Sequence, residues 1–358
     1  RVGPGLAYSR SNPDHRLNAP AQRHWIDPRQ PNEFLDWLET SGCLRDDPSA
    51  VSESGSVFAR RRDFGRFLSG IVAGYQSRGE LEHQRSRVVQ VDADPQGGWQ
   101  LSLESGETLG AEAVFLATGN SEPEFPSSVP KALWSRSDVV RDGLDDAALL
   151  EGLGHDDHVL ILGSGLSTLD TLMTLARAGH RGRISILSRR GLRPRPQPPA
   201  SARPAMLQLS SPEDQRQAAV PDFLSGSRRV RVILRRLRQR IASDASLGLP
   251  WYVAFSELRE HLWWLWPALP PAERQRCIRR LGIWYQVHRF LSVPQTDAQV
   301  HMLEQAGRLQ WLVGRIRGMR ALSGQPSGLE LDWLPASERV PATLRFDRLV
   351  NCTGVAAR

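Results

Sequence analysis

The chain has 358 residues, 40% of them hydrophobic, and a formal net charge of +7. This length is enough for a sizeable core and indicates two domains. Lys131 is the only lysine, so 45 of the 46 basic residues are arginine. Such a complete bias indicates coding composition spread over the whole protein rather than a local nucleic-acid patch.

Cysteine usage and hydropathy exclude several other classes of protein. Cys43, Cys277 and Cys352 are far apart and form no C-x-x-C pair, metal-binding spacing or disulfide framework. We therefore expect no metal and a reducing, cytoplasmic compartment. No apolar run approaches the ~18 residues of a membrane span, so we expect no membrane partner.

Residues 159–190 predict a β-α-β unit. The apolar run 159–162 is typical of a strand buried on both faces. Apolar residues then recur at helical spacing over 166–176, Gly179 ends the helix, and 184–187 form a second strand.

Two glycines at the first turn of this unit predict a dinucleotide site. Gly163 permits a tight turn, and Gly165 lets the backbone approach phosphates at the positive end of the following helix. The third glycine of the full fingerprint would fall at Thr168, so the motif is G-x-G-x-S-x-x-D, with Ser167 and Asp170. The alternative is an ordinary tight turn, but the register of strand, turn and helix favours pyrophosphate binding.

The second strand ends in Ser188, Arg189 and Arg190. NAD-selective sites place an acidic residue here, whereas a hydroxyl and two guanidiniums suit the 2′-phosphate of NADP. We therefore favour NADP, with NAD still possible if these arginines only begin the following arginine-rich loop.

Strand patterns on either side of this unit predict a second dinucleotide-binding domain. Helices are expected at 34–38 and 63–75, then alternating strands at 87–91 and 99–103, and a buried strand at 113–116 that runs into Thr118 and Gly119. The same order recurs near the C-terminus, where strands at 309–317, 329–333 and 344–350 run into Thr353 and Gly354. This repetition indicates that the chain leaves one domain at Thr118–Gly119 and returns at Thr353–Gly354.

Taken together, these motifs resemble a family of bacterial FAD/NAD(P)-binding flavoproteins. The family is grouped with nitrosuccinate-forming L-aspartate N-monooxygenases and FAD-dependent urate hydroxylases. The resemblance is carried by several segments in chain order, namely G-L-A-Y-S at 5–9, D-H-R-L-N at 14–18, R-R-D-F-G-R-F at 61–67, L-A-T-G-N at 116–120, G-S-G-L-S-T-L-D at 163–170, W-Y-Q-V-H-R at 284–289 and N-C-T-G at 351–354.

The resemblance implies an α/β fold with two Rossmann-like domains. The expected FAD domain is discontinuous and truncated, with a first part at 1–122 and a return at 341–358. The expected NAD(P) domain covers 155–340, with a helical insertion at about 225–295. Asn18, Thr118 and Gly119 would lie on the flavin side, with Thr353 and Gly354 at the return.

The chain departs from this family at its ends and at one motif. It begins at Arg1 without the glycine-rich FAD strand and stops soon after Gly354, so we expect a fragment of a longer protein. Similar proteins often continue V-H-R as H-R-H-R, whereas this chain has His288, Arg289 and then Phe290. His288 and Arg289 are our candidates for substrate contact, although a packed histidine is the more common role.

The expected insertion is basic and aromatic. Residues 228–241 predict an arginine-rich helix with one apolar face. RNA or membrane binding is one interpretation, but we favour a solvated face on a packed helix. The tryptophans at 251, 263, 264, 266 and 284 are more typical of a core than of a ligand site.

The function expected from these features is FAD-dependent, NADPH-using monooxygenation. An oxygen atom from O₂ would pass to a small polar substrate, with an amine nitrogen as one candidate acceptor and the cofactor supplying the difficult chemistry. The alternatives are a flavoprotein reductase that does not oxygenate, a non-catalytic nucleotide-binding protein and an arginine-rich RNA-binding module. The sequence does not determine the oligomeric state.

Overall fold

A seven-stranded sheet forms the centre of the protein. We describe a computed structural model that places residues 2–198, 220–322 and 328–354. The strand order is β4-β10-β5-β6-β7-β8-β9. The strands are β4 (Val139–Val140), β5 (Val159–Leu162), β6 (Ile184–Ser188), β7 (Leu309–Ala321), β8 (Leu329–Pro335), β9 (Ala342–Phe346) and β10 (Arg348–Asn351).

The predicted β-α-β unit is confirmed at the middle of this sheet. β5 and β6 pair in parallel, with Val159 opposite Ile184, and α4 (Leu166–Arg177) connects them. Leu160 and Leu162 enter one hydrophobic core, while the alternate residues of β5 enter a second core beneath α4 and α10 (Pro294–Gln305). Because both faces of β5 are buried, the strand is apolar at every residue instead of alternating between apolar and polar residues.

The C-terminal strands correct our expected domain boundaries. Residues 344–350 were expected as one strand, but β9 pairs antiparallel with β8, and β10 then pairs in parallel with both β4 and β5. The prediction that 341–358 returns to the first domain is therefore wrong for 342–351. The start at 155 is also too late, because β4 lies in the same sheet. An apolar pattern identifies a strand but not its neighbours.

The first part of the chain packs around α1 (Glu33–Thr40) and α2 (Arg61–Ser77), which confirms the two helices expected there. Phe34, Phe64 and Phe67 make edge-to-face and stacked ring contacts at the centre of their core. Two single-turn 3-10 helices, Ala21–Arg23 and Pro48–Ala50, lie beside them. This unit leads into a separate sheet of β1 (Val88–Ala93), β2 (Trp99–Leu103) and β3 (Thr108–Ala111).

The strand expected at 113–116 does not form. Phe115 is 92% exposed and Leu116 is 81% exposed, and the segment pairs with no strand in the described part of the chain. A fully apolar run is stable as a strand only when neighbouring strands satisfy its backbone groups and cover both faces. The segment continues through the 3-10 helix Lys131–Leu133 towards β4 and α3 (Asp146–Leu150).

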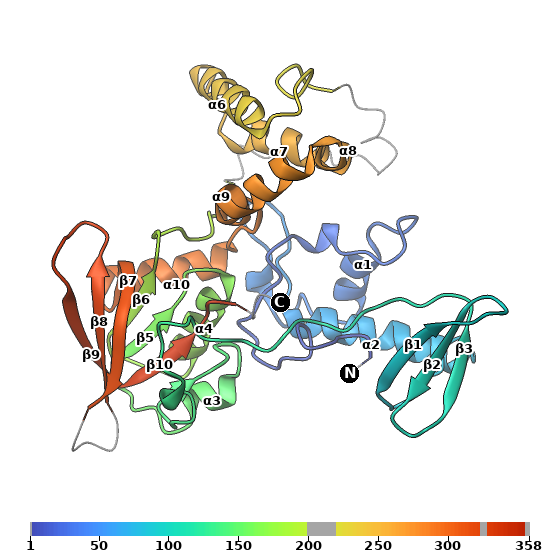
Figure 1. Ribbon diagram of the computed structural model, residues 1–358, viewed down its shortest axis with the longest axis horizontal. Helices are drawn as coiled ribbons and strands as arrows, with labels where there is room; N and C mark the ends of the chain where they lie inside the picture. The colour runs from blue at the N-terminus through green and yellow to red at the C-terminus, as the bar shows by residue number, and fades with distance from the viewer. Residues whose placement is uncertain (1, 199–219, 323–327, 355–358) are drawn as a thin grey trace.

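Helices α6 (Val230–Ser246), α7 (Tyr252–Glu260), α8 (Leu262–Ala268) and α9 (Pro271–Arg289) form a unit above the sheet (Figure 1). They lie within the expected insertion of about 225–295. Their core includes Leu237 and Leu265, with Trp264 and Trp266 packed against it, whereas Trp263 and Trp284 are exposed. The core interpretation thus holds for only some of these tryptophans. The proline-rich loop after β6 has no regular element over 191–198, and its remainder at 199–219 lies outside the described residues.

Candidate functional site

The turn at Gly163 is set by close packing against the end of β10. Gly163 has φ +103°, and a Cβ here would lie 2.3 Å from the carbonyl oxygen of Cys352. Backbone cannot move aside as a flexible side chain can, so no other residue fits at this position. The sequence predicted the tight turn, but it could not show that a neighbouring strand end closes over it.

Gly165 leaves the N-terminus of α4 open. It is the N-cap residue of the helix, it is exposed, and a Cβ added to it would meet nothing within 4 Å. The first N–H groups of a helix lack partners inside the helix and lie at its positive end, so they favour an anion. Ser167 lies half-buried in the first turn. These residues fit a pyrophosphate.

Thr168 compensates for the missing third glycine. Its side chain is fully buried, and its hydroxyl donates a hydrogen bond of 3.0 Å to the carbonyl oxygen of Gly163. The nearby hydroxyl of Ser164 donates to the carbonyl oxygen of Leu192 at 2.5 Å, which ties the loop after β6 to the same turn. The departure from the fingerprint therefore stabilises the turn.

The end of β6 presents two free guanidiniums. Ser188 is half-buried, and its hydroxyl accepts a hydrogen bond from the backbone N–H of Gly191 at 3.1 Å. Arg189 and Arg190 are exposed and have no acidic partner among the residues that the structure describes. Because β5 and β6 are adjacent and parallel, this strand end lies at the same sheet edge as the Gly163 turn. The three residues fit a 2′-phosphate.

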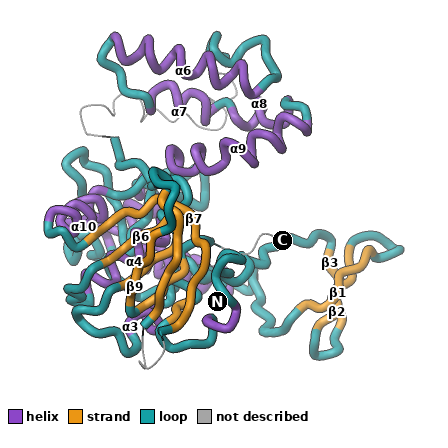
Figure 2. Tube along the Cα trace, turned by 60° about the vertical axis from the view of Figure 1, so that its left-hand side comes forward, coloured by secondary structure: helices purple, strands orange, loops and turns teal. Residues whose placement is uncertain are grey.

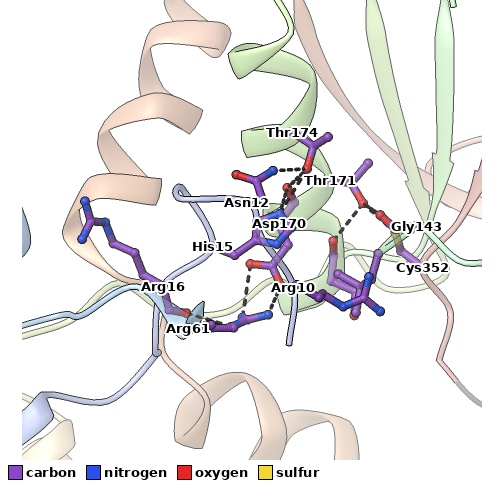
Figure 3. Close-up of polar contacts among 12 residues, drawn as sticks. Arg10, Asn12, His15, Arg16, Arg61, Gly143, Asp170, Thr171, Thr174 and Cys352 are labelled. Atoms are coloured by element: carbon purple, nitrogen blue, oxygen red, sulfur yellow. Dashed lines mark hydrogen bonds and ion pairs between the residues drawn. The ribbon is translucent and has the colours of Figure 1, made fainter. Parts of the chain in front are cut away.

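The opposite flank of α4 contacts the N-terminal unit, which the sequence did not predict (Figure 3). Arg61 of α2 binds both carboxylate oxygens of Asp170, at 2.7 and 3.2 Å. His15 is buried, and its Nε2 lies 3.2 Å from the carbonyl oxygen of Asp170 and 3.1 Å from the hydroxyl of Thr174. Asn12 donates to the same hydroxyl at 2.9 Å. We call these five residues the α4 clamp.

One signal could have predicted the α4 clamp. Asp170 and Thr174 lie four positions apart in the predicted helix, so they share one face, and Asp170 is the only carboxylate of that helix. A buried aspartate on such a face requires a cation, and the chain offers Arg61 in a motif that we had used only for the family resemblance.

The expected flavin-side residues lie along the connections between the two units. The hydroxyl of Thr353 donates to the carbonyl oxygen of Glu124 at 3.3 Å, so the two connections run side by side. The backbone oxygen of Asn18 accepts from Gln197 at 3.0 Å. Thr118, Gly119 and Gly354 are exposed.

The candidate substrate residues lie at the end of α9. The carbonyl oxygen of Trp284 accepts a hydrogen bond from Nδ1 of His288 at 2.7 Å, which leaves Nε2 as the acceptor of the neutral ring. The His288 ring lies 4.8 Å from Trp251, edge to face, and Arg289 is exposed. The backbone N–H of Arg195 donates to the carbonyl oxygen of Val287 at 3.0 Å, which fixes this end of α9 to the loop that follows Arg190.

A second guanidinium lies near Arg289. Burial lowers the pKa of Arg259, and the charge of Arg289 lowers it further, while Tyr285 and Glu260 act in the opposite direction. The Arg259 side chain has no ion pair or hydrogen bond within the described ranges. Two neighbouring cations of which neither forms an ion pair in the described residues favour binding of an anion.

Thiol and metal chemistry find no support in the described residues. Cys43, Cys277 and Cys352 are all free. Burial raises the pKa of the Cys352 thiol to about 12, so it remains protonated and unreactive. Across the placed residues, no group of three or more histidine, cysteine, aspartate or glutamate side chains could hold a metal ion. None of the described helices is long and apolar enough to cross a membrane.

Comparisons with known proteins agree with this architecture. Residues 1–121, about a third of the chain, match a family model described as FAD-NAD(P)-binding. The fold is similar to the FAD-bound cadaverine monooxygenase DfoA of Erwinia amylovora, with a TM-score of 0.57 and 16% identity over 99% of this chain and 70% of that one. A search of curated proteins found no match.

Two further solved structures have the same fold. The ornithine N-hydroxylase KtzI of Kutzneria sp. 744, solved with reduced FAD, NADP⁺ and L-ornithine, gives a TM-score of 0.56 at 16% identity, covering 96% of this chain and 70% of that one. The L-lysine 6-monooxygenase of Pseudomonas syringae gives 0.53 at 16% identity, covering 96% and 69%. The chain therefore has the Rossmann-type α/β fold of these flavoproteins.

Proposed function

We propose that the protein is a flavin-dependent, NADPH-using monooxygenase that oxygenates a small polar substrate at nitrogen. The observation that carries this proposal is the open N-terminus of α4 beside two unpaired arginines at the end of β6. The flavin part of the proposal is supported by the family match of residues 1–121 and by the fold of the N-hydroxylating monooxygenases.

Each part of NADP has residues suited to hold it. Gly163, Gly165 and Ser167 would bind the pyrophosphate through backbone N–H groups and a hydroxyl. Ser188, Arg189 and Arg190 would bind the 2′-phosphate, since guanidiniums form paired hydrogen bonds with phosphate oxygens. The clamp residue Asp170 would keep α4 fixed against the N-terminal unit while the cofactor binds.

The flavin would lie along the connections between the units. Asn18, Thr118, Gly119, Thr353 and Gly354 are the residues that we assign to this side. Bound FAD would supply the redox chemistry by accepting hydride from NADPH and activating O₂. The protein would then act by binding, orientation and exclusion of water.

The end of α9 would receive an anionic substrate. Arg259 and Arg289 supply positive charge, His288 offers Nε2 as a hydrogen-bond acceptor, and Trp251 supplies an aromatic surface. Aspartate and urate, the substrates of the groups that the sequence resembles, are both anions at neutral pH. We therefore propose an anionic amine or nitrogen heterocycle as the substrate, handled by a bacterial enzyme in the cytoplasm.

The first experiment mixes the purified, FAD-loaded protein with NADPH or NADH without oxygen and follows the loss of flavin absorbance. Arg189→Ser/Arg190→Ser should raise the concentration of NADPH required by about 10- to 100-fold and leave NADH unchanged. Arg183→Ser, an exposed arginine before β6, is the matched control. If the required concentrations of NADPH and NADH rose equally, the assigned 2′-phosphate site would be contradicted.

Oxygen consumption separates the alternatives. A monooxygenase incorporates oxygen into the product, which mass spectrometry detects with ¹⁸O₂. A reductase without oxygenation would oxidise NADPH but label no compound among candidate anionic amines and urate. A protein that binds NADP yet remains colourless with added FAD would be a nucleotide-binding protein only.

A further inference from the structure

The positive charge of the protein is concentrated in the helical insertion. Residues 220–290 contain thirteen arginines and five carboxylates, an excess of eight positive charges, whereas the whole chain carries +7. The rest of the chain is therefore close to neutral. The preference for arginine over lysine is general, but the excess of charge is local, which corrects the interpretation that we drew from composition.

A row of unpaired arginines on α6 forms the outer surface of this insertion. Arg231, Arg235 and Arg238 are spaced at i, i+4 and i+7, so they lie on one face. All three are exposed, and none has an ion pair or side-chain hydrogen bond within the described ranges. The apolar face of α6, with Ile233 and Leu237, is already buried against α7 and α8, so the row presents only charge.

The sheet of β1, β2 and β3 carries the opposite charge. Residues 88–112 contain five carboxylates and no basic residue. These are Asp92, Asp94, Glu104, Glu107 and Glu112, and none of them forms an ion pair in the described part of the chain. The two surfaces lie at different ends of the molecule, with α6 at the top and the three-stranded sheet at the right in Figure 1, and they remain separate in the view of Figure 2.

A hollow on the acidic sheet is suited to an arginine. It is lined by Asp94, Trp99, Glu112 and the backbone of Gly97, Gly98, Gly110 and Ala111. Trp99 is 42% exposed, so its ring is available. A guanidinium entering this hollow could stack on the tryptophan and pair with a carboxylate.

From these surfaces we infer that two copies of the chain associate, with α6 of one copy against the three-stranded sheet of the other. A single contact of this kind would extend into an open chain of copies, whereas two equal contacts about a two-fold axis close a dimer. We propose the closed dimer. Its partner is a second copy because the chain itself supplies the complementary charge. This inference rests on the charge distribution and is independent of the proposed enzymatic function.

The test measures mass in solution by sedimentation and light scattering at two salt concentrations. At about 0.1 M salt, where charges act over about 10 Å, we expect twice the chain mass of 40.0 kDa. At about 1 M salt, where the range falls to about 3 Å, the chain mass itself should appear. A 40.0 kDa species at low salt, up to the highest soluble concentration, would overturn the proposal.

Charge reversal identifies the surfaces. The variants are Arg231→Glu/Arg235→Glu/Arg238→Glu on α6 and Glu104→Arg/Glu107→Arg/Glu112→Arg on the sheet. Each alone should be monomeric with unchanged circular dichroism, because its two surfaces now repel. Their equimolar mixture should recover the dimer, because both contacts between unlike copies become attractive.

A matched control excludes a general effect of net charge. Arg183→Glu/Arg315→Glu/Arg339→Glu reverses three exposed arginines elsewhere and should leave the dimer intact. Three results would refute the proposal. They are a mixture that stays monomeric, an α6 variant that dimerises like the unmodified protein, and a control variant that dissociates equally. In the last case the association would be only non-specific attraction.

Discussion

Two segments with the same sequence pattern adopt different structures in this protein. Residues 113–116 are all apolar, residues 348–351 have Leu349 and Val350 at their centre, and each segment leads into a Thr-Gly pair. β10 is buried at every residue and pairs with β4 on one side and β5 on the other. The first segment forms no strand, and Phe115 is 92% exposed. An apolar run predicts a strand only where neighbouring strands exist to receive it.

The turns after these segments are nevertheless alike. Gly119 has φ +74° and Gly354 has φ +96°, a region that favours glycine. The turn is a local property that its own residues determine, whereas the strand depends on contacts that are distant in sequence. The two levels of structure can therefore be tested separately.

The largest difference is expected between two glycine substitutions. Gly163→Ala should lower the free energy of unfolding by about 4 kcal/mol, because its Cβ would lie 2.3 Å from the carbonyl oxygen of Cys352. Gly119→Ala should cost about 1 kcal/mol, since only its positive φ is unfavourable and nothing lies within 4 Å. Chemical denaturation of both variants checks this. Equal losses would mean that β10 does not close over the turn.

Side-chain truncation should separate the two apolar segments. Leu349→Ala should lower the free energy of unfolding by about 2–5 kcal/mol, because Leu349 is fully buried in the sheet. Leu116→Ala should change it by less than about 0.5 kcal/mol, as expected at 81% exposure. Thermal melting of the two variants measures the difference. An equal drop in melting temperature for Leu116→Ala and Leu349→Ala would contradict this prediction.

The α4 clamp should have an intermediate effect. Arg61→Ala leaves Asp170 without its cation, and because the pair is largely but not fully buried we expect a loss of about 2 kcal/mol. Combining Arg61→Ala with Asp170→Asn should cost less than the sum of the single changes. A double-mutant cycle measures this coupling, and simple additivity would show that the pair contributes nothing. Arg62→Ala, an arginine next to Arg61 without an ion pair in the described residues, is the control.

The smallest expected effect is a pH dependence of the free energy of unfolding, caused by two buried or half-buried histidines beside β5 and α4. Burial lowers the pKa of both His158 and His180. The unfolded chain, with histidine pKa values of about 6.5, then binds protons that the folded protein does not, so stability is full above about pH 6.5 and declines below it. Unfolding measured between about pH 8 and 5 should show this decline. The decline in stability should be smaller in His158→Gln/His180→Gln. It should be unchanged in the control His83→Gln, which replaces an exposed histidine.

Sequence reasoning succeeded where one segment contains its own partners. β5, α4 and β6 lie within 159–188, so periodicity and two glycines were sufficient to predict them. It failed where the partner is distant. Nothing near Asn351 shows that β10 inserts between β4 and β5, and the residues near Asp170 indicate the need for a cation without showing that Arg61 supplies it. For the candidate site, the sequence could name the residues. Only the structure could show that the space beside Gly165 is open and that Arg189 has no acidic partner in the described residues.

The way in which the insertion is attached has a consequence for how this fold can diversify. Pro196 and Ser292 form a bridge, so the chain enters and leaves the helical unit at adjacent points. A segment whose ends are already held together adds little closure entropy to the rest of the fold, whatever its length. The four helices could therefore be replaced by a shorter loop or a different module without altering the strand order beneath them. In evolutionary terms, the seven-stranded sheet is the constant platform, and what lies between residues 196 and 292 is the part that can be exchanged.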